Sequence, residues 1–466
     1  NGVNNAFDDG SASNHTITAN GNVTQGSFGP FARPDGEWGV SFRGVADFIE
    51  GPSVDLLGSG AFTVECWVNV PSKTTAANYT DAFLAQYETN NQFILGTKVN
   101  VVRVWMGGSE VRVGSTAIVG NGWHHIALTR NASNSVRLFV DGSADGAAFT
   151  DSTNFSQNLE NFEIGSWNSG ANSALNGNIS NLRVVKGTAV YDPSASTITV
   201  PSSSLTAITN TSLLTCQSNR FIDNSANSYA LTPSNQTAVT AFGPFLTSAV
   251  YDPAVNGASA YFDGSGESLV VDATVISQAG NFTFEGWAYS NSADSQTIGG
   301  QYTSSTTGRM VIYSNGGHLY WYQNGTTQYN TANSALLGQW CHFVLMRTGS
   351  NIALYINGTR VHNVTAANME QSDFIVGAEF PNGNNSMNGY ISNIRCTASA
   401  VYSEGTSITV PTAPYSTVTN TNLLLNMADG QAIDSAAQNN LALFGNAKLS
   451  TGQAKFGDTS LLLDGT

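Results

Sequence analysis

Apolar and polar residues alternate with a period of two in many short stretches of the chain, and Gly or Asn bounds these stretches. Phe62-Thr-Val-Glu-Cys-Trp67 and Phe282-Thr-Phe-Glu-Gly-Trp287 are two examples. A period of two over such a length predicts half-buried β-strands. Convincing amphipathic helices are missing throughout the sequence, so the pattern predicts an all-β protein.

One block of the sequence occurs twice. Trp123-His-His-Ile-Ala-Leu-Thr-Arg130 is followed by Arg137-Leu-Phe-Val-Asp-Gly142, and the second copy is Trp340-Cys-His-Phe-Val-Leu-Met-Arg347 with Ala353-Leu-Tyr-Ile-Asn-Gly358. Asp-Gly and Asn-Gly between alternating runs favour hairpins, because both residues of a type I′ turn need positive φ. A whole supersecondary unit has therefore been duplicated.

Further pairs extend the repeat over most of the chain: Phe28-Gly-Pro-Phe31 with Phe242-Gly-Pro-Phe245, Val104-Trp-Met106 with Tyr320-Trp-Tyr322, and Asn176-Gly-Asn-Ile-Ser-Asn-Leu-Arg183 with Asn388-Gly-Tyr-Ile-Ser-Asn-Ile-Arg395. Short strands with frequent turn signals, over a module of about 210 residues, predict a two-sheet antiparallel jelly-roll sandwich.

Connectors of one length, from Val200 to Asn210 and from Val410 to Asn420, follow the modules. We expect three domains: 1–204, a jelly roll without its first strand; 205–415, a complete jelly roll; and 416–466, the start of a third. Equal connectors favour a stiff, regularly stepped rod. Both ends cut through modules, so we expect a longer parent protein with completed or capped ends.

Composition narrows the class of partner. Only 11% of the 466 residues are charged and the net charge is −15, so Ser, Thr, Asn and Gly supply the solubility, as is typical of extracellular β proteins. The negative charge disfavours nucleic acids, polyanions and anionic membranes. No apolar run approaches 18 residues, so we expect no membrane insertion.

The four cysteines do not recur between the copies: Cys66, Cys216, Cys341 and Cys396. No disulfide therefore belongs to the repeated design, and we interpret all four as small apolar residues.

Glu65 and Glu285 recur and invite comparison with a catalytic carboxylate. Glycoside hydrolases need two carboxyl groups about 5 Å apart in the retaining case, and a single one cannot do both jobs. We interpret each Glu as a structural polar contact with one of these recurrent residues: His125 or His342, Arg130 or Arg347. The sequence also lacks zinc-ligand spacing, a nucleophile elbow and a phosphate loop, so we predict a protein that is not an enzyme.

A cofactor is not expected, although calcium stays an alternative. Asp81, Asp141, Asp145 and Asp151 could supply carboxylate ligands. Asn357 replaces Asp141 in the second copy, and a turn position already explains an Asp or Asn there.

The repeated motifs Phe-Thr-x-Glu-x-Trp, Trp-x-His and Asn-Gly-x-Ile-Ser-Asn resemble the laminin-G-like branch of the concanavalin A-like jelly rolls. The resemblance covers essentially the whole chain. It implies a curved sandwich of about a dozen strands that often binds glycans or proteins, sometimes with one calcium ion. Asp223-Asn-Ser-Ala-Asn227 and Lys186-Gly-Thr-Ala-Val-Tyr191 are similar to tandem modules in virion proteins of marine bacteriophages.

Sugar recognition needs exposed aromatic faces beside amide and hydroxyl groups. Trp167 and Asn168 lie in a loop-like stretch, and Tyr320 and Tyr322 flank Trp321 on the opposite strand face. These four residues are the carbohydrate-binding candidates, with ordinary packing as the alternative. Trp105 and Trp321 recur and are predicted to be core residues.

Together, these features favour a structural and adhesive virion protein on a capsid or tail appendage, located at the virion surface. Its expected partners are other virion subunits, copies of itself and host-surface polysaccharide. Two alternatives remain open: a bacterial secreted or cell-surface adhesin, and carbohydrate-binding accessory modules of a larger enzyme.

Overall fold

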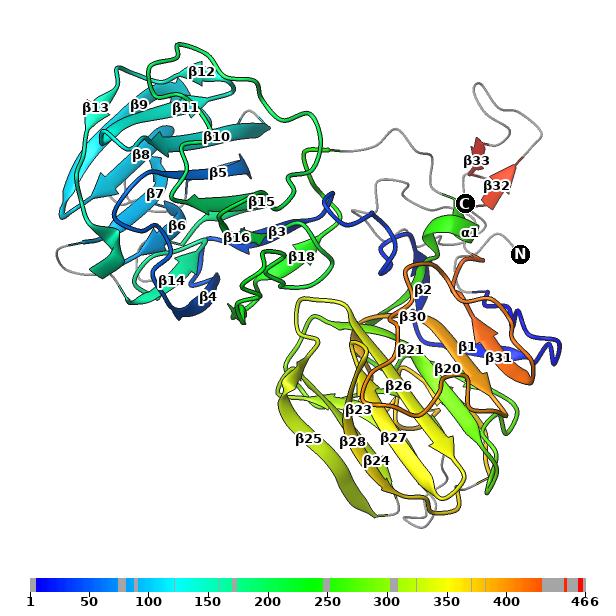
Figure 1. The fold of residues 1–466 in the computed structure, drawn as a ribbon. Coiled ribbons are helices and arrows are strands. Elements are labelled where there is room, and N and C mark those ends of the chain that lie inside the picture. The colour runs from blue at the N-terminus through cyan, green and yellow to red at the C-terminus, as the bar shows by residue number, and fades with distance from the viewer. Residues whose placement is uncertain are drawn as a thin grey trace. The chain divides into compact units, whose positions relative to one another are not determined.

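The structure, a computed structural model, describes residues 6–73, 81–87, 91–120, 122–157, 159–169, 174–245, 252–301, 309–323, 325–369, 371–381, 383–429, 448–450 and 460–463. The chain forms two compact units (Figure 1). The first jelly roll is Pro34–Ser248, and the second jelly roll combines Asn1–Arg33 with Ala249–Thr466.

One sheet of the first jelly roll runs in the order β12 (Ser143–Ala144), β11 (Ser135–Val140), β10 (Trp123–Arg130), β5 (Phe62–Asn69), β15 (Asn176–Lys186), β3 (Gly39–Arg43) and β18 (Ala238–Thr240). In addition, β13 (Phe149–Thr150) pairs with β11, and β16 (Thr211–Thr215) pairs with β15.

The other sheet runs in the order β17 (Thr232–Ser234), β4 (Phe48–Ser53), β14 (Asn161–Ile164), β6 (Asp81–Gln86), β7 (Phe93–Lys98), β8 (Val101–Met106) and β9 (Ser109–Ala117). Between the sheets, Phe62 packs edge-to-face on Phe93 at 6.2 Å, and both rings contact Phe155 of the 3₁₀-helix η1 (Phe155–Gln157). The inward-facing apolar positions of the alternating strands thus form the core.

The second jelly roll repeats this plan. Its larger sheet runs in the order β2 (Thr24–Gly26), β19 (Ser259–Asp263), β30 (Asn388–Thr397), β21 (Phe282–Ser290), β26 (Cys341–Thr348), β27 (Asn351–Ile356) and β28 (Thr359–Thr365), with β31 (Thr421–Leu425) beside β30.

Its smaller sheet runs in the order β1 (Ile17–Asn20), β20 (Ser268–Val271), β29 (Phe374–Val376), β22 (Gln296–Gln301), β23 (Met310–Asn315), β24 (His318–Gln323) and β25 (Thr326–Ala335). Phe284 of one sheet packs on Phe374 of the other at 5.1 Å. The remaining elements are the short helix α1 (Pro253–Asn256) and the pair β32 (Lys448–Ser450) and β33 (Ser460–Leu462).

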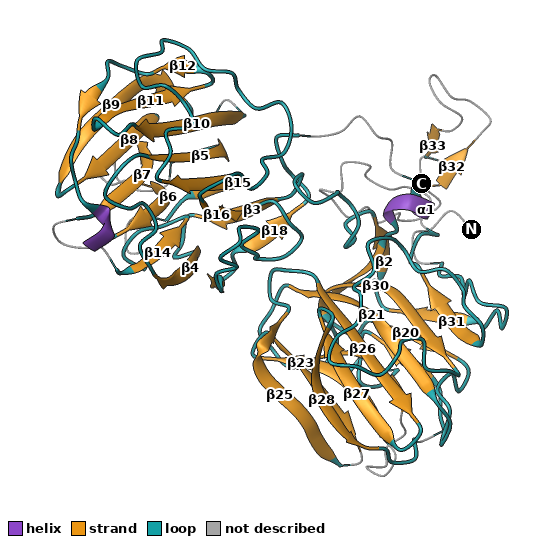
Figure 2. Cartoon of the chain, in the orientation of Figure 1, coloured by secondary structure: helices purple, strands orange, loops and turns teal. Residues whose placement is uncertain are grey.

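The predicted all-β class of tandem two-sheet antiparallel sandwiches is confirmed, as the strands in Figure 2 show. The hairpin turns are confirmed as well. Asp141 and Gly142 have φ of 49° and 80°, and Asn357 and Gly358 have 48° and 85°. These positive values explain why only Asp, Asn and Gly occur there.

The compact units differ from the expected domains 1–204, 205–415 and 416–466 in where the closing strands pack. β16, β17 and β18 complete the sandwich that precedes them, while β1 and β2 pair with the second jelly roll. Alternation predicts a strand but not its partner, because backbone hydrogen bonds are indifferent to sequence. The third jelly roll expected within 416–466 falls largely outside the described residues.

The alignment of Val104-Trp-Met106 with Tyr320-Trp-Tyr322, which we took from the sequence repeat, is wrong by one position. Trp105 pairs with Ile94, and the residue at the matching place on β24 is Tyr322, which pairs with Val311. Trp321 is fully buried, as predicted, whereas Trp105 is only half-buried and points away from the core. Aligning the two Trp residues therefore shifted the strand by one position and reversed its faces.

All four cysteines are buried and free, which confirms their interpretation as small apolar residues. Burial raises the pKa of Cys216 to about 12, so its thiol is uncharged at neutral pH. In the described part of the chain, no helix has the length and apolar character needed to cross a membrane.

Candidate functional site

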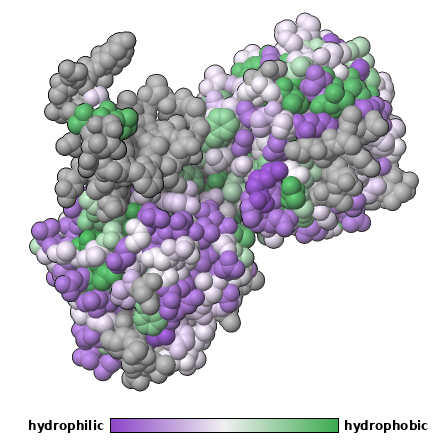
Figure 3. Space-filling model, turned by 180° about the vertical axis from the view of Figure 1, so that it is seen from behind, coloured by the Kyte–Doolittle hydropathy of each residue, from purple (hydrophilic) through white to green (hydrophobic). Residues whose placement is uncertain are grey.

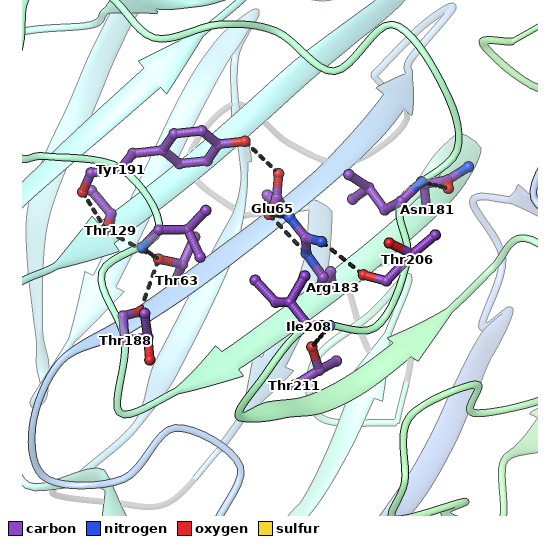
Figure 4. A network of polar contacts seen from close by, with 12 residues as sticks. Thr63, Glu65, Thr129, Asn181, Arg183, Thr188, Tyr191, Thr206, Ile208 and Thr211 are labelled. Atoms are coloured by element: carbon purple, nitrogen blue, oxygen red, sulfur yellow. Dashed lines mark hydrogen bonds and ion pairs between the residues drawn. The ribbon is translucent and has the colours of Figure 1, made fainter.

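The recurrent Glu65 lies in a buried polar cluster of the first jelly roll (Figure 4). Its Oε1 accepts hydrogen bonds from Arg183 at 2.6 and 3.0 Å, and its Oε2 accepts one from Tyr191 Oη at 2.8 Å. Nε2 of His125 stands 3.4 Å from the same Oε2. The contact with His125 is thus one of those predicted.

The second jelly roll repeats the cluster. Arg395 donates to Glu285 Oε1 at 2.8 and 2.6 Å, and Tyr402 donates to Oε2 at 2.7 Å. His342 hydrogen-bonds to Tyr415 Oη at 2.8 Å. Glu285 is as fully buried as Glu65, so the cluster belongs to the shared framework of the two sandwiches.

Burial by itself would raise the pKa of Glu65, but the hydrogen bond from His125 and the charge of Arg183 outweigh it and hold the pKa below its ordinary value. Glu65 is therefore a carboxylate with fixed partners and no exposed surface. A general acid needs the opposite, a raised pKa and access to substrate.

Arg130 and Arg347 were expected as partners of these carboxylates, but both donate to backbone carbonyl oxygens. Arg183 and Arg395 take that role. Both end the recurrent Asn-Gly-x-Ile-Ser-Asn-x-Arg motif, and recurrence of a charged residue on a predicted core strand was the signal that could have identified them.

The calcium candidates lie apart and are bound by protein groups. Asp141 accepts from His124 and from His125 N at 2.6 and 2.9 Å, and Asp145 from Ser115 Oγ at 2.7 Å. Asp81 pairs with Lys73 at 2.9 Å, and Asp151 caps Thr153. The described residues hold no group of three or more His, Cys, Asp or Glu that could bind a metal ion.

Trp167 lies beyond β14, on the outer face of the smaller sheet of the first jelly roll. Its ring tilts against Tyr87 at 5.2 Å, and Tyr87 is 44% exposed. Trp167 and Trp105 are both half-buried and pack on Ala85 and Ile94 of the neighbouring strands. Figure 3 shows that hydrophobic residues also gather on one face of this jelly roll.

Polar groups surround these rings. The Arg103 guanidinium lies 4.8 Å from the Trp105 ring centroid. Asn168 is exposed and has a φ of 58°, and the next residue, Ser169, donates its N–H to Glu163 Oε1 at 2.9 Å. Burial raises the pKa of Glu163. We name Trp167, Trp105, Tyr87, Asn168 and Glu163 the first aromatic face.

Tyr320 and Tyr322 occupy the matching outer face of the second jelly roll. Tyr320 stacks on Tyr313 at 5.1 Å, and Arg309 lies 5.1 Å from the Tyr322 ring. Arg309 also pairs with Glu379. Since Tyr322 matches Trp105, both jelly rolls place an aromatic ring beside a guanidinium at the same point of the same sheet. We name Tyr313, Tyr320, Tyr322 and Arg309 the second aromatic face.

A polar pocket of about 300 Å³ lies at the rim of the second jelly roll. Its lining consists of carboxylate, amide and hydroxyl groups with glycine backbone: Asp263, Gly264, Asp294, Ser295, Gln296, Gly383, Asn384, Asn385, Ser386 and Asn388. These groups can hydrogen-bond to sugar hydroxyls, but sequence reasoning missed the pocket because its loops are far apart in the chain.

Asp263 of this pocket hydrogen-bonds to Glu267, whose side chain is buried; burial and this acidic neighbour raise the pKa of Glu267. The first jelly roll has Arg43 and Asp47 at the matching positions, joined by a salt bridge of 2.9 Å. The repeat therefore exchanges an ion pair for two carboxyl groups, which makes the second rim more acidic.

The chain matches the sequence profile of a laminin G family, described as "Concanavalin A-like lectin/glucanases superfamily", over residues 43–189 and 263–404. The chain belongs to this superfamily. The matched residues span both sandwiches, so each jelly roll is a laminin G-like, lectin-like module. A search of the curated proteins finds no match.

Solved structures with a similar fold include mouse laminin α1 chain domains LG4-5, with 12% identity, a TM-score of 0.29, and coverage of 80% of this chain and 94% of that one. The SAP-like pentraxin of Limulus polyphemus has 13% identity, a TM-score of 0.31, and coverage of 46% and 99%. Domain 4 of an extracellular arabinanase from Geobacillus stearothermophilus has 15% identity, a TM-score of 0.27, and coverage of 31% and 73%.

Proposed function

We propose that this laminin G-like chain is a non-enzymatic adhesive protein whose two aromatic faces bind glycans. One observation carries the proposal: both modules place a half-buried aromatic ring beside an arginine at the same point of the same sheet, Trp105 with Arg103 and Tyr322 with Arg309. A lectin-like fold is compatible with carbohydrate binding or adhesion.

The chemistry of the first aromatic face suits a sugar. The apolar face of a pyranose can stack on the Trp167 and Tyr87 rings, while its hydroxyls reach the Asn168 amide and the Glu163 carboxyl group. Sites of this kind hold their ligand by one stacked ring and a few convergent polar groups. Single-site affinities of about millimolar become useful when linked modules bind together.

Replacement of Trp167 by Ala tests this surface. Binding of the purified chain to host-surface polysaccharide should weaken about tenfold, because the stacking platform is lost. Leu159→Ala is the matched control, since Leu159 is 56% exposed and lies outside the face. Unchanged binding by Trp167→Ala, with both variants folded, removes the first aromatic face as a glycan site.

The place of action that we propose is the virion surface, on a capsid or tail appendage. The segments 223–227 and 186–191, which are similar to bacteriophage virion modules, support this proposal. The expected partners are copies of this chain, other virion subunits and host-surface polysaccharide. Immunogold labelling of intact particles should decorate an appendage; label confined to the surface of bacterial cells would contradict it and indicate an adhesin of the host.

A further inference from the structure

One loop beside the rim pocket has the same place in both jelly rolls. In the first it joins β3 to β4, and Arg43, the last residue of β3, pairs with Asn176 of β15. In the second it joins β19 to β20, and Asp263, the last residue of β19, pairs with Asn388 of β30. Because Asn176 and Asn388 both begin the recurrent Asn-Gly-x-Ile-Ser-Asn motif, Arg43 and Asp263 occupy equivalent positions in strand pairing as well as in sequence.

In the first jelly roll, a guanidinium neutralises a buried carboxylate of this loop. The side chain of Asp47 is fully buried. Arg43 Nε donates to its Oδ2 at 2.9 Å and Arg43 Nη2 to its Oδ1 at 3.1 Å, while Arg43 Nη1 donates to Gln236 Oε1. A bidentate contact of this kind gives both carboxylate oxygens a charged donor. The first jelly roll thus supplies the countercharge from its own chain.

In the second jelly roll, Glu267 occupies the position of Asp47 and is also buried, but its neighbour is the carboxyl group of Asp263. Ser265 N donates both to Glu267 Oε2 and to Asp263 Oδ1, at 2.9 Å each. Glu267 Oε1 is buried and receives no hydrogen bond from a nitrogen or hydroxyl group of the described residues. A buried carboxyl group without a donor or a countercharge costs free energy. Among the described residues, therefore, nothing gives Glu267 the charge that Arg43 gives Asp47.

The rim pocket adjoins this carboxyl pair. Asp263 is exposed and lines the pocket. Ser386, another lining residue, donates its hydroxyl to Glu267 O at 3.3 Å and accepts a hydrogen bond from Gly266 N at 3.2 Å. Gly383 lies so close to the same loop that a Cβ there would stand 2.3 Å from Gly266 Cα. The loop that carries Asp263 and Glu267 is therefore held against the loop of Gly383 and Ser386, which also lines the pocket.

The chemistry of the pocket suits a cation. Asp263 and Asp294 are two exposed acids of its lining, and the other side chains are amides and hydroxyls. The described lining residues include no Lys, Arg or His, and no aromatic ring. A volume of about 300 Å³ is at the lower end of the range for ligand pockets, so a small charged group fits it. The net charge of −15 also draws cations toward the chain.

We propose that the rim pocket of the second jelly roll binds the guanidinium group of an arginine side chain from a partner protein. The bound guanidinium donates to Asp263 and supplies the countercharge that Glu267 lacks, as Arg43 does for Asp47 in the first jelly roll. A guanidinium suits the pocket better than an ammonium group, because its planar fork donates to two acceptors at once. It suits the pocket better than a sugar, because the described lining residues offer no ring for stacking.

Titration of the full chain with Nα-acetylarginine amide, followed by ligand-observed NMR, tests the site. This probe should bind about tenfold more tightly than Nα-acetylcitrulline amide, a neutral probe of the same shape that cannot make charge-assisted hydrogen bonds. Asp263→Asn should weaken binding of the arginine probe about tenfold, because it removes the exposed carboxylate. Asp263→Arg should abolish binding, because the new side chain takes the place of the ligand as Arg43 does in the first jelly roll.

Asp272→Arg is the matched control, since Asp272 is an exposed acid of the same jelly roll outside the pocket and its replacement changes the net charge equally. This variant should keep most of the binding. The proposal is overturned if the arginine and citrulline probes bind alike, or if Asp263→Arg and Asp272→Arg lose the same affinity. Glucosamine or calcium chloride that binds more tightly than the arginine probe, and is displaced by Asp263→Arg, would also overturn it by identifying an amino sugar or a metal ion as the ligand.

Discussion

Each module carries a buried carboxylate that the fold uses as a fixed charge. Glu65 joins β5 to β15 through Arg183 and to the following segment through Tyr191. The sequence predicted a structural Glu, because no second carboxylate shares its strand face. It did not identify Arg183, because the pairing of β5 with β15 brings together residues that are 118 positions apart.

Arg183→Met should destabilise the first jelly roll by about 3–5 kcal/mol, because Glu65 would be left buried without its countercharge. Urea denaturation at pH 7 measures the change. Arg137→Met, a half-buried arginine of β11, is the control and should cost less than about 1 kcal/mol. Equal losses of stability in both variants would mean that the Glu65–Arg183 pair contributes no more to stability than a half-buried surface arginine does.

Acid should weaken the same cluster. The pKa of Glu65 is lowered in the folded state, so its stabilising contribution is complete above the ordinary value of 4.5 and is lost as pH falls through the folded pKa. Glu65→Gln should therefore flatten the acid limb of the stability curve between about pH 5 and pH 2. An unchanged acid limb would contradict the lowered pKa.

Asp263→Arg should stabilise the second jelly roll by about 1 kcal/mol at pH 7, since it recreates the Arg43–Asp47 pair of the first. The reason is that the pKa of Glu267 is raised by burial and by Asp263, so stability is lost as pH rises through that pKa. Differential scanning calorimetry at pH 4 and pH 7 measures the gain, which should shrink at pH 4. A lower melting temperature at pH 7 would count against the carboxyl pair.

At the scale of strands, periodicity identified most elements but not all of their faces. The strands Phe62–Asn69 and Phe282–Ser290 could be predicted from the alternation of apolar and polar residues and from the Thr, Glu and Trp that recur at the same positions in both. Trp105 was assigned to the wrong face because a shared Trp-containing tripeptide aligned one position away from the structural register. A one-residue slip is invisible in composition and reverses every side chain.

The irregularity in β15 explains why Ser-Asn recurs in both modules. Asn181 has a φ of 51° where the register shifts between Ser180 and Arg183, and its side chain bonds to Gly36 O and Leu205 N. The shift turns Arg183 toward Glu65, so a local bulge positions the charge pair.

Asn181→Ala should lower the free energy of unfolding by about 2–3 kcal/mol. It removes the hydrogen bonds to Gly36 O and Leu205 N, and Ala is less suited than Asn to the positive φ at the bulge. Asn134→Ala is the control and should cost about 1 kcal/mol or less, since Asn134 also has positive φ, 63°, but is half-buried in the turn between β10 and β11. Thermal unfolding of both variants decides; equal losses would show that the bulge has no role beyond its turn geometry.

At the scale of the molecule, the repeat predicted two sandwiches of one plan, and the two sandwiches are observed. Which segment closes each sandwich was not predictable, because residues 7–31 and 221–245 carry the same Phe-Gly-Pro-Phe motif and the same Asp-x-Ser turn. The four glycan candidates, Trp167, Asn168, Tyr320 and Tyr322, lie on or beside matching outer faces. Their role in binding stays a prediction.

Two faces on one chain give a specific expectation for affinity. Trp167→Ala and Tyr322→Ala each remove one platform and leave the other, so each single variant should still bind a surface coated with host polysaccharide, about tenfold more weakly. The double variant should lose the avidity of both sites.

The most direct measurement is therefore biolayer interferometry on that polysaccharide surface with the wild-type chain, both single variants and the double variant, all verified as folded. We predict graded weakening in the single variants and no detectable binding in the double variant. Binding of the double variant equal to that of the wild-type chain would contradict the claim that the aromatic faces are the glycan-binding surfaces.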